Sequence, residues 1–391
     1  MTQSPLDRAH AYQAELVSIR RDIHAHPELG LEEVRTAEIV ARKLEEWGIE
    51  VHRGIGITGV VGVLRNGNGQ ASVGLRADMD ALPILEASGL PHASQNPGKM
   101  HACGHDGHTT MLLGAAKYLA ETRNFNGTVN FIFQPAEEGV GGALAMLEDK
   151  LFERFPCNAV YGMHNRPGLA VGKYITGPGV RSAGGAFFDI VITGKGAHGA
   201  HPSQSIDPVL VACHLGTALQ SIVSRNVHPR DTAVLSITRI QSGDAYNVIP
   251  QTATMAGTVR TMKREVMTLV RENMERLATS VAAGFGAEAK LDFRLIFAPM
   301  VNNDAEAQWY GDAAAGLVGE ANIDRASPPG MGSEDFSFMM EQVPGAHINL
   351  GNGDSAALHN HQYDFNDEAI PYGVALYGAI VEKKLPKGQV D

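Results

Sequence analysis

Residues His101-Ala102-Cys103-Gly104-His105-Asp106-Gly107-His108 bring one thiol, three imidazoles and one carboxylate into eight positions. A packed hydrophobic core has no use for so many polar side chains, whereas these groups bind metal ions well. Cys103 and His105 are two residues apart, so on a helix they would point to different sides, and we expect the helix to start after them. The apolar spacing of Thr109–Leu119 predicts that this helix is buried. The stretch therefore predicts a metal-binding loop that leads into a buried helix.

Three predicted strands in the first half of the chain end in side chains suited to a binding site. These side chains are Asp78 and Asp80, then Glu137 and Glu138, then His164. In open α/β sheets the ligand crevice lies outside the carboxyl ends of the strands, so the three ends are site candidates. Adjacent residues of an extended segment face opposite ways, so one glutamate can bind metal while the other serves as a base for metal-assisted hydrolysis. Taken alone, Asp-x-Asp also fits turn chemistry, and the glutamate pair also fits an exposed acidic loop.

The hydrophobic pattern of residues 1–182 and 300–391 predicts an α/β domain with a central mixed sheet. The expected helices are residues 6–24, 32–47, 109–119, 305–318 and 367–381, and the expected strands are residues 57–64, 71–76, 127–133, 158–163 and 346–350. Asn66-Gly67-Asn68-Gly69 has the turn chemistry of a hairpin. We therefore expect the two strands that flank this turn to pair with each other.

Residues 183–299 predict a second, smaller domain inserted into the first. After Gly177-Pro178-Gly179 the pattern changes to the order β-α-β-β-α-β, which is that of a ferredoxin-like α+β unit. Its expected elements are residues 186–193, 207–227, 232–241, 252–261, 263–285 and 289–297. The α/β pattern then returns with the loop Leu358-His359-Asn360-His361. We expect this loop to supply a missing ligand to a discontinuous catalytic domain.

The composition argues against several classes of protein. Acidic residues exceed basic ones by 11, which argues against nucleic acid as a partner and for small or neutral ligands. No stretch reaches membrane-spanning length and the first residues lack the apolar segment of a signal peptide, so we expect a cytoplasmic protein with no membrane partner. The three cysteines form no disulfide framework, which fits a reducing compartment, and Cys157 and Cys213, in apolar surroundings, are interpreted as inert core residues.

A series of short motifs runs through nearly the whole chain. The motifs are Arg76–Pro83, Cys103–His108, Gln134–Glu138, Gly162–His164, Gly194–Gly199, Asn247–Pro250, Gly257–Arg260 and Leu358–Asp367. By these motifs and their order, the chain resembles the M20 metallopeptidase family. It is most similar to the amidohydrolase branch, which contains hippurate hydrolases, N-acyl-amino-acid deacylases (aminoacylases) and auxin-conjugate hydrolases.

The resemblance implies a catalytic domain that holds two divalent metal ions per subunit, and Mn, Zn, Co and Ni all suit mixed nitrogen, oxygen and sulfur ligands. The implied metal ligands are Cys103, His105, Glu138, His164 and His359. Glu137 is then the general acid/base, and His359 is selected over His361, which stands where relatives often have an apolar residue or proline. The broader family has His-x-Asp where this chain has Asp78-Met79-Asp80, so Asp78, Asp80 and also Asp106 are expected to orient ligands rather than bind metal.

The resemblance also implies roles for three residues of the smaller domain, as a lid or dimerisation domain. His198 would donate to the oxyanion, and in relatives it reaches the active site of the neighbouring subunit. Asn247 and Arg260 would bind the carboxylate of the substrate. The implied substrate is an N-acyl-amino acid, hippurate-like or N-acetylated, and the implied assembly is a homodimer or homotetramer through the lid domain. On the residues alone, His198 also fits a capping or core histidine, and Arg260 an exposed strand arginine.

Three other functions remain open at this point. The same site would also serve a dipeptidase or carboxypeptidase. Cys103 as the nucleophile of a thiol hydrolase would leave Glu137, Glu138 and the distant histidines without a role. A non-catalytic metal-dependent binding protein is expected to lack Glu137 or His198, and both are present. The sequence therefore favours a metal-dependent hydrolase that cleaves the amide bond of N-acyl-amino acids, releasing a carboxylic acid and a free amino acid.

Overall fold

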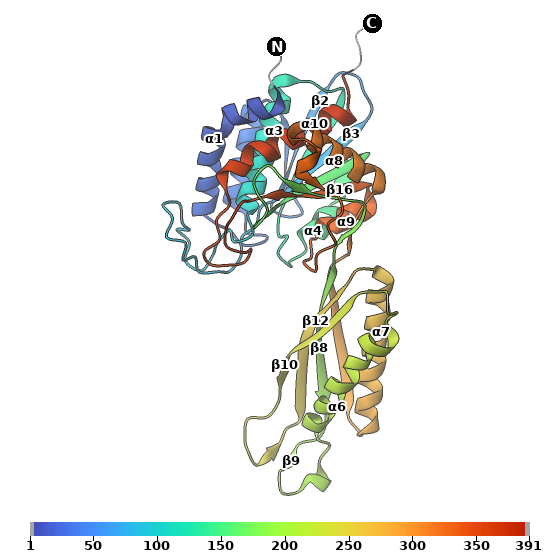
Figure 1. Cartoon of the computed structure of the whole chain (residues 1–391). Coiled ribbons are helices and arrows are strands. Elements are labelled where there is room, and N and C mark those ends of the chain that lie inside the picture. The colour runs from blue at the N-terminus through green and yellow to red at the C-terminus, as the bar shows by residue number, and fades with distance from the viewer. Residues whose placement is uncertain (1–3, 388–391) are drawn as a thin grey trace. The chain divides into compact units, whose positions relative to one another are not determined.

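The computed structural model describes residues 4–387 and divides them into two compact units (Figure 1). The first unit runs up to Arg181 and continues through Val301–Pro328 and from Asp335 onward. The second unit contains Ser182–Met300 and also Pro329–Glu334. In the described part of the chain, no helix combines the length and the apolar character needed to cross a membrane.

The first unit is built on an eight-stranded mixed sheet with the order β1-β2-β4-β3-β5-β16-β6-β15. Its strands are β1 (Glu50–Ile55), β2 (Gly59–Asn66), β3 (Ser72–Asp78), β4 (Gly127–Gln134), β5 (Ala159–Arg166), β6 (Tyr174–Ile175), β15 (Ile323–Asp324) and β16 (Gly345–Gly351). The four central strands β4, β3, β5 and β16 are parallel neighbours. The carboxyl ends of these four strands therefore lie at one edge of the sheet.

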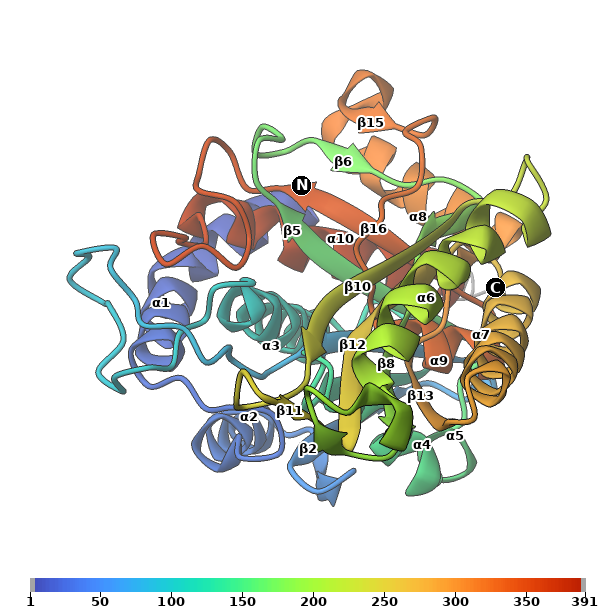
Figure 2. The same cartoon turned by 90° about the horizontal axis from the view of Figure 1, so that it is seen from below.

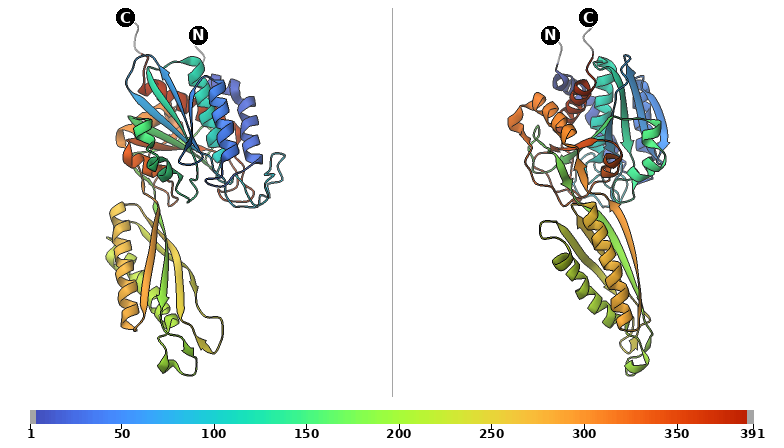
Figure 3. Two further views of the ribbon diagram at one scale, coloured as in Figure 1. Left: turned by 180° about the vertical axis from the view of Figure 1, so that it is seen from behind. Right: turned by 90° about the vertical axis from the view of Figure 1, so that its right-hand side faces the viewer.

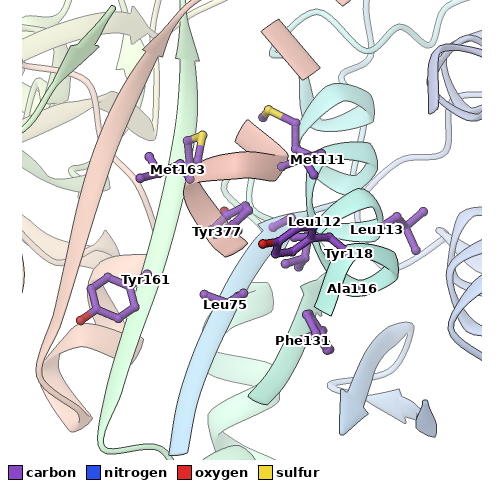
Figure 4. Packing of buried hydrophobic residues seen from close by; sticks show 14 of the residues in the cluster. Leu75, Met111, Leu112, Leu113, Ala116, Tyr118, Phe131, Tyr161, Met163 and Tyr377 are labelled. Atoms are coloured by element: carbon purple, nitrogen blue, oxygen red, sulfur yellow. The ribbon is translucent and has the colours of Figure 1, made fainter. Parts of the chain in front are cut away.

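Helices cover both faces of this sheet (Figure 3). One face carries α1 (Pro5–Ala25), α2 (Val34–Glu46), α3 (His105–Thr122), α8 (Asp304–Val318) and α10 (Ile370–Lys384), and the other carries α4 (Gly142–Glu148) and α9 (Phe336–Gln342), with α5 (Leu151–Arg154) next to α4. Leu75 of β3 and Phe131 of β4 belong to the same buried cluster as Met111 and Leu112 of α3 (Figure 4). Short helical turns η3 (Glu320–Asn322) and η4 (Asp367–Ala369) precede β15 and α10.

The second unit is a four-stranded antiparallel sheet with the order β10-β12-β8-β13, covered by two helices (Figure 2). Its elements are β8 (Gly184–Thr193), α6 (Pro208–Ser221), β10 (Ala233–Gln241), β12 (Thr252–Thr261), α7 (Arg264–Gly284) and β13 (Glu288–Phe297), with the turns η1 (Pro202–Gln204) and η2 (Ile222–Asn226). Two small ribbons pair β9 (Ala197–His198) with β11 (Val248–Ile249), and β7 (Gly179–Ser182) with β14 (Met300–Asn302). The predicted class is confirmed: an α/β unit with a central mixed sheet and a separate, smaller antiparallel sheet.

The predicted hairpin between the strands on either side of Asn66–Gly69 is wrong. Strand β4 lies between β2 and β3 and pairs with both, antiparallel to β2 and parallel to β3. The loop instead wraps the start of β4, where the side-chain oxygen of Asn126 accepts hydrogen bonds from the backbone N–H groups of Asn68 (3.0 Å) and Gly69 (2.7 Å). The hairpin partner of β2 is β1, which the sequence patterns did not indicate, as they did not indicate β6, β15, α4 or α5.

Replacing Asn126 with Ala should lower the free energy of unfolding by about 1–3 kcal/mol, because two backbone donors lose their acceptor. Urea denaturation followed by circular dichroism measures this change. Asn68→Ala is the matched control, since the Asn68 side chain is exposed in the same loop, and it should stay within about 0.5 kcal/mol of wild type. Equal stability of the two variants would contradict the anchoring role of Asn126.

Candidate metal centre

The edge of the sheet where β4, β3 and β5 end gathers the predicted site residues of the first unit. Asp78 ends β3, Glu137 and Glu138 follow β4, and His164 lies near the end of β5. The three strands are direct neighbours in the order β4-β3-β5. Side chains that are far apart in the sequence therefore lie at one edge of one sheet.

The loop before α3 places Cys103 beside His164. The Cys103 Sγ atom lies 3.4 Å from His164 Nε2. The prediction that the helix starts after His105 is wrong, because His105 is its first residue and Gly104 its N-cap. Gly104 has φ 91°, and a Cβ atom there would lie 2.6 Å from atoms of Asn165 and Tyr363. This left-handed turn changes the chain direction, so that Cys103 and His105 face the same place although the helix has begun.

Each of the two histidines near Cys103, His105 and the half-buried His164, has one ring nitrogen that donates a hydrogen bond to a backbone oxygen. His105 Nδ1 donates to the Asp80 backbone oxygen (2.9 Å), and His105 Nε2 is buried without a hydrogen-bond partner. His164 Nδ1 donates to the Asn165 backbone oxygen (2.7 Å), which leaves Nε2 facing the thiol. A hydrogen bond from one ring nitrogen to a fixed acceptor is the usual arrangement of a metal-binding histidine.

His359 reaches the same place from the far end of the chain. Its backbone N–H donates to the Ala102 oxygen (2.8 Å), and its Nε2 lies 3.2 Å from Glu138 Oε1. The Glu138 carboxylate accepts a hydrogen bond from His359 and so raises the pKa of that imidazole. His361, by contrast, is exposed, and its carbonyl accepts from the Ala87 N–H at 2.8 Å.

Among the described residues, five groups of three possible ligands have their ligand atoms within 4.8 Å of one another. Three overlapping groups consist only of residues expected to bind metal or act as the base: Cys103, His105 and His164; Cys103, Glu138 and His359; and His105, Glu137 and Glu138. The remaining groups are Asp78, His105 and His108, and Glu137, Glu334 and Asp335. His105 Nε2 is buried without a hydrogen-bond partner, and Glu138 Oε1 lies 3.2 Å from the His359 ring nitrogen. Buried polar atoms without partners are costly in a folded protein. A bound divalent cation would satisfy these atoms, so the residues present fit a metal ion.

The electrostatics of the site also fit a cation. Burial lowers the pKa of His105, but the carboxylates of Asp78, Asp80 and Glu138 outweigh burial and raise it to about 10. Burial, followed by Glu138 and Glu137, raises the pKa of the Cys103 thiol well above its ordinary value. The neighbouring carboxylates contribute to both shifts, because they favour positive charge at this place.

The three aspartates expected to orient ligands have different neighbours. Asp80 contacts His105 Nδ1 (3.1 Å) and accepts from the backbone N–H of Glu138 (3.0 Å), so it ties two ligand segments together. Asp78 accepts from Arg76 at 2.7 Å. Asp106 faces α1 instead, where it pairs with His24 at 2.8 Å.

His108 has a role that sequence reasoning did not assign. Its Nδ1 donates to Asp78 Oδ1 (2.6 Å), and its Nε2 accepts from the Asn165 backbone N–H (3.0 Å). It thereby links the end of β3 to the end of β5 beside His164. The signal was present, since His108 follows His105 by three residues and such residues share a helix face.

Glu137 is buried beside the same loop. Its Oε1 accepts from the Asp335 backbone N–H at 3.4 Å, whereas the backbone N–H of Glu138 bonds to Asp80. The two carboxylates have different neighbours, Asp335 for Glu137 and His359 for Glu138, but both residues lie in a turn after β4 and not in the extended segment that we expected.

The remaining predicted residues lie in the second unit. His198 on β9 pairs with Val248 on β11, and its Nδ1 accepts from the Ala200 N–H at 3.0 Å. Asn247 directly precedes β11, so these strands bring Asn247 and His198 together. Arg260 on β12 is half-buried, and burial lowers its pKa. The Arg260 guanidinium lies 6.0 Å from the centre of the Phe187 ring.

A thiol, imidazoles and carboxylates at the carboxyl edge of a sheet, with a second glutamate beside them, define the site of a metal-dependent hydrolase. A model of Peptidase family M20/M25/M40 matches residues 74–383. Hippurate hydrolase of Campylobacter jejuni is 44% identical over 373 residues, which cover 95% of this chain and 97% of that protein. N-acetylcysteine deacetylase of Bacillus subtilis is 40% identical over 362 residues, which cover 92% of this chain and 94% of that protein.

A solved structure agrees with these relatives. The crystal structure of a dinuclear metal binding peptidase from the M20 family of Bacillus subtilis matches with a TM-score of 0.83 at 36% identity, covering 96% of this chain and 99% of that chain. The chain therefore belongs to the M20 peptidase family, in its amidohydrolase branch. It is an enzyme of the class that hydrolyses linear amides.

Binding of a divalent ion should release protons and tighten as the pH rises. Cys103 and His105 must lose their protons to bind metal, and both have pKa values above their ordinary range. Below those pKa values protons compete with the ion, so the apparent affinity falls as the pH is lowered. Titration calorimetry of metal-free protein with Zn²⁺, in buffers of different ionisation enthalpy, counts the protons released. Cys103→Ser should release fewer, and an unchanged count would exclude Cys103 as a ligand.

Proposed function

We propose that this protein hydrolyses N-acyl-amino acids, releasing a carboxylic acid and a free amino acid. The observation that carries the proposal is the meeting of Cys103, His105, Glu138, His164 and His359 beside a further buried glutamate, Glu137. The names of the relatives support the substrate class, since one acts on hippurate and another on N-acetylcysteine. Hippurate-like and N-acetylated amino acids are the proposed substrates.

The proposed cofactor is a pair of divalent ions, with Mn, Zn, Co and Ni as candidates. Cys103, His105, Glu138, His164 and His359 would hold them, in the overlapping groups described above. Bound divalent ions lower the pKa of water and polarise a carbonyl oxygen. Asp80 would fix the positions of His105 and the Glu138 segment relative to each other, because it bonds to both.

Glu137 is proposed as the general base and acid. Its carboxylate takes the proton of the attacking water and returns it to the departing amine nitrogen. This role suits Glu137, because its carboxylate lies within 4.8 Å of the ligand atoms of His105 and Glu138 but belongs to neither of the two groups that contain Cys103. Its neighbour Glu138 does not suit the role if it binds metal, because coordination to a cation lowers the basicity of a carboxylate.

The second unit is proposed to complete the site as a lid and dimerisation domain with a ferredoxin-like fold, and the first unit is proposed as the catalytic domain. Its β-α-β-β-α-β order and antiparallel sheet support that fold. His198 would donate to the oxyanion of the tetrahedral intermediate from a neighbouring subunit of a homodimer or homotetramer. Arg260 and Asn247 would bind the free carboxylate of the amino acid. A cytoplasmic location is also proposed, supported by three cysteines that are all free.

Glu137→Gln should keep metal content near wild type while lowering kcat on hippurate by about 10²–10⁴-fold, because it removes the base and no ligand. Glu138→Gln is the matched control one residue away and should lose metal as well as activity. Metal analysis and steady-state kinetics on a panel of hippurate and N-acetyl-amino acids measure both effects. Near wild-type kcat in Glu137→Gln would overturn its role, and no turnover of any panel member by metal-loaded wild type would overturn the substrate class.

His198→Ala should be inactive alone and should regain part of its activity when mixed with the inactive Glu137→Ala. A mixed dimer holds one site with both an intact Glu137 and an intact His198 only if the histidine acts across subunits. Refolding or co-expressing two differently tagged variants, purifying the heterodimer and assaying hippurate hydrolysis tests this arrangement. Absence of recovery in a purified heterodimer would show that His198 acts within its own chain.

A further inference from the structure

Arg20 on α1 is a fully buried cation that joins four segments of the first unit. Its guanidinium pairs with Asp106 at 3.3 Å, with Asp364 at 2.9 Å and with Asp367 at 2.8 Å. It also lies 3.2 Å from His92 Nε2, and His92 pairs with Asp364 at 3.0 Å. The side chains of Arg20 and Asp106 are both 0% exposed.

The partners of Arg20 come from the two segments that carry metal ligands. Asp106 directly follows His105 in the loop at the start of α3. Asp364 and Asp367 lie in the segment that follows His359. The Arg20 guanidinium therefore binds both segments that carry proposed ligands. Asp106 faces α1, so this contact lies away from the proposed metal centre.

Close packing joins the same two segments directly. The His359 N–H donates to the Ala102 oxygen at 2.8 Å. Tyr363 packs on Gly104, where an added Cβ atom would lie 2.6 Å from its hydroxyl, and Phe365 fills the space beside Gly107. The segment after His359 therefore has little room to move toward the Cys103–His105 loop. Its position also depends on the ion pairs of Arg20 with Asp364 and Asp367.

The charges explain why an arginine is needed at this place. Asp106, Asp364 and Asp367 would repel one another without a cation between them. His24 contributes a second positive charge: burial lowers its pKa, but Asp106 outweighs burial and raises it to about 9. The planar fork of arginine can bind several carboxylates in fixed directions, which a lysine cannot.

We propose that Arg20 is a positioning residue for the metal centre. Arg20 fixes the His359 segment against the Cys103–His105 loop and so determines how tightly the protein binds the ion that His359 contacts. The inference rests on the proposed two-ion site. Arg20 would contact neither metal nor substrate, and its effect on binding would be specific to one of the two ions.

The test compares metal binding by the full-length chain in five forms. Metal-free wild type, Arg20→Lys, Arg21→Met, His359→Ala and the double variant Arg20→Lys/His359→Ala are titrated with Co²⁺ by calorimetry, and folding is checked by circular dichroism. Arg21→Met is the matched control, because Arg21 is the next residue, is half exposed and binds Asp367 from outside at 2.8 Å. Arg20→Met serves as a second variant if Arg20→Lys retains all contacts.

We expect Arg20→Lys to lose at least tenfold in affinity for one ion, the same ion that His359→Ala weakens, and to leave the other within threefold of wild type. Arg21→Met should stay within threefold for both ions. The double variant should lose little more than His359→Ala alone, because both changes act on one ligand. Such non-additivity is not expected of a residue that only stabilises the fold.

Equal weakening of both ions, or full additivity in the double variant, would overturn the inference and leave Arg20 as a structural residue. Unchanged affinities in both Arg20→Lys and Arg20→Met would also overturn it. If His359→Ala weakens an ion and the Arg20 variants do not, the inference alone fails. If His359→Ala weakens no ion, the proposed ligand set fails, and the inference fails with it.

Discussion

The first unit holds a thiol, imidazoles and carboxylates close together in one small space at the edge of its sheet. His105 Nε2 is buried without a hydrogen bond, and the Cys103 thiol is buried next to carboxylates. An arrangement of this kind is unfavourable unless surrounding groups fix it, because each atom would otherwise turn toward a better partner. The surrounding hydrogen bonds act on the opposite ends of the same side chains, as Asp80 does for His105 and the Asn165 carbonyl for His164.

The parts of the site that sequence could predict are those fixed by local rules. Strands that end in Asp78, Glu137 and His164 are recognisable from the pattern, and parallel strands align their carboxyl ends. The left-handed turn at Gly104 was not predictable in this way, so the start of α3 was misplaced. The hairpin expected at Asn66–Gly69 failed for a similar reason: the turn chemistry is local, but β4 comes from 60 residues further along the chain and inserts between the two strands.

Contacts over long sequence distances account for what the sequence left open. Arg20 pairs with Asp106 at a separation of 86 residues and with Asp364 at 344. Helical spacing places Arg20 on the apolar face of α1 with Leu16 and Ile23, whereas Arg21 is half exposed. No local pattern, however, indicates which carboxylates Arg20 meets inside the fold. The proposed roles of His198, Asn247 and Arg260 could not be read from a local pattern either. They rest on the family resemblance.

Backbone strain coincides with the ligand segments. Ala136 has φ 50° and directly precedes the two glutamates, and His359 has φ 63°. Non-glycine residues in this region cost about 1–3 kcal/mol and persist only where the surrounding structure fixes them. The Ala136 N–H donates to Glu33 Oε1 at 2.8 Å, and Gly30 allows the backbone to approach Ala136 closely, while the His359 N–H is held by Ala102. A relaxed backbone at Ala136 would redirect the two glutamates that follow it, and a relaxed backbone at His359 would redirect its ring. The strain at these two residues therefore fixes side chains of the proposed metal centre in place.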